Sequence, residues 1–152
     1  MELNLQQLQA MTQDELRNQV AEAFKQQGFG VERPPKSHQS GADLIAKRHR
    51  DDDSLESIAI QVRKLARRVG LMDLMELLYA KSQYGCEDAL MISASGFTDT
   101  AVKGRENTGC WLWGLGDLVT YAAGKLQAYE IGMGAAASSK DSPEEEAELS
   151  AP

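Results

Sequence analysis

The sequence is poor in cysteine, histidine and long apolar runs, and each shortage excludes a class of protein. Its 152 residues include two cysteines, Cys86 and Cys110, and two histidines, His38 and His49. These are too few and too widely spaced for a disulfide framework or a Cys/His zinc site. No apolar run approaches the roughly 20 residues that a membrane-spanning helix needs. Residues 1–10 lack the basic start and apolar core of a signal peptide, so we expect a reduced, cytoplasmic setting.

Positive charge is also in short supply, but it is clustered. The formal net charge is −7, which excludes a globally basic protein. Part of this negative charge lies in residues 140–152, where Lys140 stands beside five carboxylates. The cations gather instead in KRHR (47–50) and RKLARR (63–68). A local basic face that contacts a nucleic acid therefore remains open.

The composition is that of one globular domain with a tail. Hydrophobic residues make up 42% and charged residues 26% of the chain, as in ordinary soluble domains. The length suits one domain with a substantial core rather than two. We place this domain at residues 1–131. Residues 132–152 are rich in Gly, Ala and Ser and then acidic, so we expect a disordered tail.

Apolar spacing and turn residues predict alternating helices and strands. Thr12 and Glu15 form a capping-box pattern ahead of a stripe of apolar residues four apart, which predicts a helix to about Phe24. Further helices are expected over 70–84, from 98 and over 117–126. Strands or extended segments are expected over 29–35, 42–46, 57–65, 89–93 and 110–114.

The order of these elements predicts a three-layer α/β domain. The early strands are close enough in sequence to pair as a hairpin, whereas the later ones are separated by helices and should pair in parallel. The result is a mixed central sheet with helices on both faces. Trp111 and Trp113 share one face of their strand, and we expect them to pack in the core against the last helix.

The expected hairpin carries polar residues where apolar ones are the rule. Asp43 lies in its first strand, and Gln61, Arg63 and Lys64 lie in its second. Because side chains alternate across a strand, Gln61 and Arg63 share one face and Lys64 points to the other. A carboxylate, an amide oxygen and a nearby cation are groups that can hold Mg²⁺ against a phosphodiester. A solvated hairpin face is the commoner explanation of such residues, and both interpretations stay open on chemistry alone.

Two further segments offer contacts to phosphate. RKLARR contains Arg67 and Arg68, which fit a phosphate-contacting stripe or an ordinary solvated loop. SGFT contains Ser95 and Thr98 at the start of a predicted helix, where backbone amides can bind an anion. A plain turn with Thr98 as the helix N-cap explains the second segment as well, and we expect that to be its main role.

Several stretches of the chain follow one another in the order and with the spacings of a known family. They are QVAEAFKQQGFGVE, GADLIA, IAIQVRK, VGLMDLMELLYAKSQYG, SGFTDTA and CWLWGLGDLVTY. From Thr12 to about Ala122 the chain resembles the Mrr-type restriction endonuclease-like family of the PD-(D/E)xK nuclease superfamily. The resemblance implies a restriction endonuclease-like fold, DNA as partner and Mg²⁺ as cofactor. It also implies that Asp43 and Gln61 are metal ligands and that Arg63 stands where the family usually has a catalytic lysine.

The chain departs from that family at two positions. Arg17 stands where a glutamate is common on the first helix, and Arg63 cannot give up its proton as a lysine can. Lys64 is the obvious substitute, but strand alternation points it away unless a bulge intervenes. Two functions therefore stay open. One is a Mg²⁺-dependent DNA endonuclease, expected to act as a homodimer, and the other is a catalytically inactive nuclease fold that binds DNA or another protein.

Overall fold

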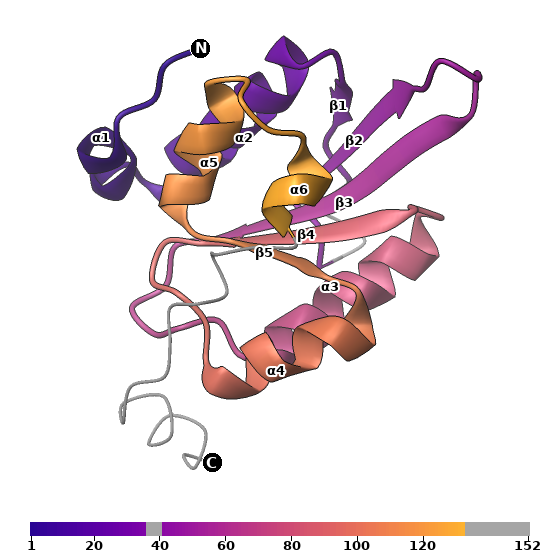
Figure 1. The fold of residues 1–152 in the computed structure, drawn as a ribbon. Helices are drawn as coiled ribbons and strands as arrows, with labels where there is room; N and C mark the ends of the chain where they lie inside the picture. Colours follow the sequence, from indigo (N-terminus) through magenta and orange to yellow (C-terminus); the bar gives the residue numbers. More distant parts are fainter. Residues whose placement is uncertain (36–40, 133–152) are drawn as a thin grey trace.

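A five-stranded mixed sheet runs through the middle of the molecule (Figure 1). The computed structural model describes residues 1–35 and 41–132. In spatial order the strands are β1 (Gly30–Glu32), β2 (Leu44–His49), β3 (Leu55–Arg63), β4 (Asp88–Ser93) and β5 (Trp111–Trp113). The pairs β1–β2 and β2–β3 are antiparallel, whereas β3–β4 and β4–β5 are parallel. The predicted hairpin and the mixed sheet are confirmed.

Helices cover both faces of this sheet, which confirms the three-layer α/β architecture (Figure 1). They are α1 (Leu5–Ala10), α2 (Gln13–Gln26), α3 (Leu71–Gln83), α4 (Asp99–Thr108), α5 (Leu115–Ala122) and α6 (Ala128–Gly132). The helices α3 and α4 pack on one face, and the other four lie on the opposite face. Among the described residues, no helix combines the length and the apolar character needed to span a membrane.

The two faces of the sheet bury different kinds of core. On the α2/α5 face the aromatic rings of Phe24, Trp113 and Tyr121 contact one another, with centroids 4.7 Å apart for Phe24–Tyr121 and 5.2 Å for Trp113–Tyr121. Trp111 belongs to the same core, so the predicted packing of both tryptophans is confirmed. The α3/α4 face is lined mainly by non-aromatic residues such as Ala59 and Leu74, together with Phe97. Three of the polar residues of the hairpin, Asp43, Gln61 and Arg63, lie at one end of this second face.

Local sequence signals set the start of α2 as predicted. The hydroxyl of Thr12 accepts from the Glu15 N–H at 3.1 Å, and the Glu15 carboxylate accepts from the Thr12 N–H at 2.9 Å. The short helices α1 and α6 were not predicted, because neither is long enough to show a period. Residues 36–40 lie outside the described residues, as does the expected disordered tail of 132–152 apart from Gly132, which ends α6. The domain boundary at 131 stays a prediction.

Candidate active site

Asp43 lies directly before β2, at the open end of the β2–β3 hairpin. Its backbone N–H donates to the carbonyl oxygen of Ile60 at 2.7 Å, and its Oδ2 accepts from the Val62 N–H at 2.7 Å. Since Leu44 pairs with Ile60, extending the register by one residue places Asp43 opposite Gln61. The structure therefore brings these two predicted site residues together, from positions 18 apart in the sequence.

Gly41, two residues before Asp43, lies against the backbone of α3. A Cβ atom on Gly41 would lie 2.4 Å from the carbonyl oxygen of Glu76 and 2.9 Å from the Leu77 nitrogen. No side chain fits at such distances, so glycine is required for this close approach. The contact fixes Asp43 between α3 and the end of β3.

Gln61 and Arg63 point to the α3/α4 face, as alternation along β3 predicts. Gln61 is 4% exposed, and within the described ranges its Oε1 is a buried acceptor without a hydrogen-bond partner. Arg63 reaches toward α3, where its Nη2 lies 3.8 Å from Oε1 of Glu76. Such buried polar atoms are rare in folded proteins and are often completed by water, an ion or a ligand. This end of β3 therefore offers an acceptor and a cation to a bound group.

Arg17, the residue that stands in place of the family's glutamate, lies against Asp43. Its Nε is 3.3 Å from Oδ1 of Asp43, and its Nη1 donates to Oδ1 of Asp14 at 2.6 Å. The Arg17 and Asp43 side chains are 24% and 23% exposed, so their attraction is only partly screened by water. Asp43 thus has one oxygen bonded to β3 and the other beside a guanidinium.

Lys64 lies elsewhere, at the corner between α1 and α2. Its Nζ donates to the backbone carbonyls of Gln9, at 2.6 Å, and of Met11. Its backbone N–H donates to Oε1 of Gln13 at 2.8 Å, while Nε2 of Gln13 donates to the Val62 carbonyl at 2.6 Å. Lys64 follows the strand alternation away from Gln61 and Arg63, so the structure does not bring it to Asp43. Gln13 joins the start of α2 to the end of β3, a role that no pattern in the sequence indicated.

The four predicted DNA contacts gather around two neighbouring loops. An isolated bridge between Val69 and Phe97 joins the loop after β3 to the loop after β4. Ser95 Oγ donates to the Arg67 carbonyl at 2.5 Å, and Arg68 is partly exposed next to it. The Thr98 hydroxyl accepts from the Ala101 N–H at 3.2 Å and is 1% exposed, so it caps α4 as expected.

Arg67 is tied down by a carboxylate on α3. Its Nη1 donates to Oδ2 of Asp73 at 2.9 Å, and the same oxygen accepts from the Gly70 N–H at 3.0 Å. Burial is the largest influence on Asp73 and raises its pKa, but the Arg67 and Gly70 bonds outweigh it and hold the pKa below the ordinary value. More than half of the Arg67 side chain remains exposed to solvent.

The donor set at this end of the hairpin fits a hard divalent ion. Asp43 and Gln61 supply a carboxylate and an amide oxygen, and Mg²⁺ often takes one or two such protein ligands and keeps several waters. Among the described residues the buried Gln61 Oε1 has no hydrogen-bond partner, as expected of an oxygen that is available to coordinate an ion. In the part of the chain that is described, no group of three or more His, Cys, Asp or Glu side chains is placed to hold a metal ion. Water and phosphate would therefore have to supply most of the coordination.

Comparisons with known proteins agree with this fold. The family model Mrr_cat, described as restriction endonuclease, matches residues 8–121. A solved protein of unknown function, AF1548, superposes with a TM-score of 0.50 at 19% identity over 76% of this chain and 62% of its own. The MspJI restriction endonuclease, in complex with a 27-mer oligonucleotide, superposes with a TM-score of 0.53 at 16% identity over 76% and 28%.

This chain spans less than two thirds of the length of either solved protein, and those likenesses concern the fold. No curated protein matches the chain. The family match runs from within α1 to the last turn of α5 and includes Asp43, Gln61 and Arg63. The chain belongs to the Mrr_cat family of restriction endonucleases.

Proposed function

We propose that the chain is a DNA endonuclease of the Mrr restriction type that hydrolyses phosphodiester bonds with Mg²⁺. The observation that carries the proposal is the convergence of Asp43 and Gln61 across the hairpin, with a buried Gln61 oxygen that lacks a partner among the described residues. Arg63 follows on the same face of β3. Membership of a restriction endonuclease family supports the same chemistry.

In this proposal Asp43 and Gln61 would hold the ion, and a bound ion would polarise the phosphate and lower the pKa of a water for attack on phosphorus. The hydrogen bond from the Val62 N–H fixes the Asp43 carboxylate against β3. Arg63 donates to the non-bridging phosphate oxygens and offsets the negative charge that builds up on them. A guanidinium is a poor proton acceptor, so we do not expect Arg63 to take the proton of the attacking water.

The proposed DNA path runs over the joined loops after β3 and β4. Arg67 and Arg68 supply cations there, and each phosphate contact steepens the salt dependence of binding. The MspJI restriction endonuclease was solved in complex with an oligonucleotide, and we propose DNA as the partner here too. Cleavage of both strands calls for two sites, so we further propose a homodimer, acting in the cytoplasm.

A second function is favoured by the contact between Arg17 and Asp43. A guanidinium 3.3 Å from the only carboxylate of the donor set partly neutralises it and opposes a divalent ion. In that case the fold binds DNA or another protein without cleaving it. Fold alone does not decide between the two functions.

Plasmid nicking separates these functions. Supercoiled plasmid is incubated with Mg²⁺ or Mn²⁺ and the wild-type chain, Asp43→Asn or Asp52→Asn. Asparagine at 43 can still accept from the Val62 N–H but loses the charge, so we expect nicking to fall at least about 100-fold. Asp52 lies at the far turn of the hairpin, so Asp52→Asn is the control with the same change of charge. Retarded DNA without nicking supports the second function, and nicking unaffected by Asp43→Asn contradicts the first.

A gain of function sharpens the result. The double variant Arg17→Glu/Arg63→Lys supplies a second carboxylate near Asp43 and a lysine on the site face of β3. If the site has the geometry described, we expect cleavage above that of the wild type. No gain from this pair, in a variant that folds normally, counts against the placement of these residues around one phosphate.

A further inference from the structure

We infer that Arg17 competes with the divalent ion for Asp43 and so sets how tightly the chain binds metal. The inference rests on the proposed metal site, but it concerns binding rather than cleavage. Nothing in the sequence pattern requires it, since an arginine on α2 could equally point to solvent. The structure instead turns this side chain toward the one carboxylate of the donor set.

Buried polar atoms without hydrogen-bond partners are concentrated here. Counted over residues 1–35 and 41–132, six side-chain atoms are in this state, and three of them are Arg17 Nε, Gln61 Oε1 and Arg63 Nε. Arg17 Nε is within ion-pair distance of Asp43 Oδ1 but is not aligned for a hydrogen bond. The contact is therefore electrostatic, and Arg17 does not donate a hydrogen bond to Oδ1. A cation that approaches Asp43 Oδ1 is therefore repelled by the nearby guanidinium but does not have to break a hydrogen bond between Arg17 and this oxygen.

Arg17 has a second carboxylate to hold when it leaves Asp43. Its Nη1 already bonds to Asp14, whose side chain is 83% exposed and one helical turn earlier on α2. Swinging the guanidinium outward therefore costs it one partner and not both. The helix itself cannot move with it, because the capping box at Thr12 and the bonds from Gln13 to β3 fix the start of α2. The competition is confined to one side chain.

The charges give the direction of the effect. An ion on Oδ1 of Asp43 would lie close to a guanidinium that now stands 3.3 Å from that oxygen, and like charges at this range repel. Removing the guanidinium should therefore tighten metal binding. Removing the Asp14 carboxylate should leave Arg17 more firmly on Asp43 and so weaken metal binding. Both changes act without touching a proposed ligand.

The test is a titration of the full chain with Mn²⁺, in which electron paramagnetic resonance follows the unbound ion. We expect Arg17→Gln to bind Mn²⁺ at least about tenfold more tightly than the wild type. Arg17→Gln/Asp43→Asn should lose this gain. Arg33→Gln is the matched control, because it removes the same charge from an exposed residue that bonds to Asn18 on the same helix, and it should leave the affinity unchanged.

Two further variants keep the inference open to refutation if Arg17→Gln folds poorly. Arg17→Lys keeps the cation and should show no tenfold gain. Asp14→Asn should weaken Mn²⁺ binding about threefold, while Glu22→Gln, which alters an exposed pair on the same helix, should not. Equal affinities for the wild type, Arg17→Gln and Asp14→Asn would overturn the inference. Such a result would not bear on the nicking experiment, which tests the proposed function separately. Conversely, if Arg17→Gln binds Mn²⁺ more tightly but the chain does not nick plasmid, the inference holds and the proposed endonuclease function fails.

Discussion

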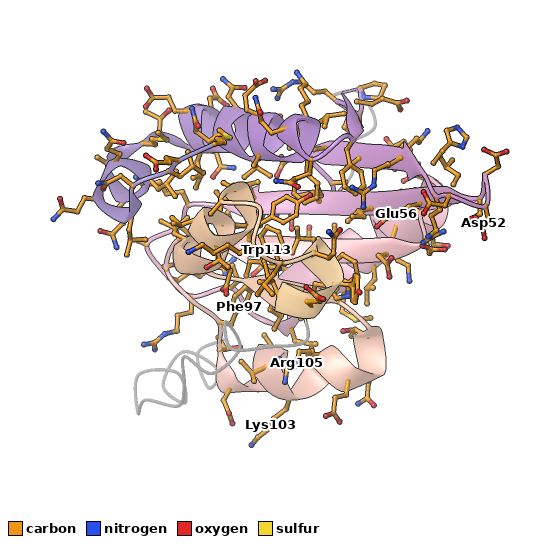
Figure 2. The ribbon with its side chains drawn as sticks, turned by 45° about the horizontal axis from the view of Figure 1, so that its top comes forward. Asp52, Glu56, Phe97, Lys103, Arg105 and Trp113 are labelled. Carbon is orange, nitrogen blue, oxygen red and sulfur yellow. The ribbon has the colours of Figure 1, made fainter. Side chains whose placement is uncertain are left out.

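The two ends of the β2–β3 hairpin carry similar charged residues but treat them differently. At the turn end, Arg48 pairs with Glu56 at 3.1 Å, donates to the Gln27 carbonyl at 2.8 Å and lies 4.1 Å from the centre of the Phe29 ring. Figure 2 shows Asp52 and Glu56 at this end. At the open end, Arg17, Gln61 and Arg63 each have a buried polar atom that finds no hydrogen-bond partner among residues 1–35 and 41–132.

This difference separates structural charge from charge that is available to a ligand. The Arg48 guanidinium has an ion pair, a backbone acceptor and an aromatic ring to contact, so the fold alone accounts for its position. Hydrogen bonds from Ser54 likewise lower the pKa of Asp52 and keep it ionised within the turn. Residues of the same chemical types at the open end stand in a buried setting with bonds still to be made, and such groups mark functional sites more often than stability.

The largest effect is expected from the glycine that positions the open end. Gly41→Ala places a methyl group 2.4 Å from the Glu76 carbonyl oxygen, and neither backbone can yield easily. We expect a loss of about 3 kcal/mol in the free energy of unfolding, together with loss of metal binding at Asp43. Chemical denaturation and the Mn²⁺ titration measure the two losses. Gly116→Ala is the control, since its Cβ would meet nothing within 4 Å, and equal stability of both variants would refute the close packing.

Much of this architecture could be predicted from the sequence, because it depends on local rules. The capping box at Thr12 set the start of α2, and strand alternation put Gln61 and Arg63 on one face and Lys64 on the other. The turn at 51–54 required that the flanking strands pair antiparallel, so Asp43 had to approach Gln61.

The long-range contacts could not be predicted from those rules. Gln13 and Lys64 are 51 residues apart, and neither residue type indicates a hydrogen bond between them. Arg17 was recognised as a departure from the family, but its contact with Asp43 depends on how α2 crosses the end of β3. Side-chain contacts of this kind are set by packing between elements, and a pattern within one element does not contain them.

The next largest effect concerns the clamp, by which we mean the two side-chain hydrogen bonds of Gln13 to Val62 and Lys64 at the open end. Gln13→Ala removes the two hydrogen bonds that join α2 to β3, and we expect a loss of about 2 kcal/mol in the free energy of unfolding. Gln13→Glu should restore little, since a carboxylate accepts from the Lys64 N–H but cannot donate to the Val62 carbonyl. Gln7→Ala on the exposed surface of α1 serves as control. A Gln13→Ala protein as stable as this control would show that the clamp is not needed.

A direct exchange of roles between the two ends is the third test. Arg48→Met loses its ion pair, its bond to Gln27 and its contact with Phe29. We therefore expect the free energy of unfolding to fall by about 1–2 kcal/mol, with DNA retention unchanged. Arg63→Met should cost less than about 0.5 kcal/mol, because its partner Glu76 is mostly exposed. It should weaken DNA retention about fivefold or more in a low-salt mobility assay. The comparison fails if the two variants behave alike in both measurements.

The smallest effect compares two carboxylates in the same local setting, one with a cation and one without. Asp73 accepts from the Gly70 N–H at 3.0 Å and Asp117 from the Gly114 N–H at 2.9 Å, each at the start of a helix. The Arg67 bond helps to bring the pKa of Asp73 below its ordinary value, whereas burial raises that of Asp117. A lowered pKa gives stability that is present above the unfolded value and lost as the pH falls through the folded one. A raised pKa has the opposite sign.

At neutral pH we therefore expect Asp73→Asn to destabilise the chain by about 1 kcal/mol and Asp117→Asn to cost less or to stabilise it slightly. The penalty at 73 should begin to shrink as the pH drops below about 4, where Asp73 of the unfolded chain takes up a proton, and it should vanish only below the lowered pKa of the folded state. Denaturation at pH 7 and pH 3 measures both differences. A penalty at 73 that stays constant between these pH values would mean that hydrogen bonding, and not the charge on Asp73, holds Arg67 in place beside the proposed DNA path.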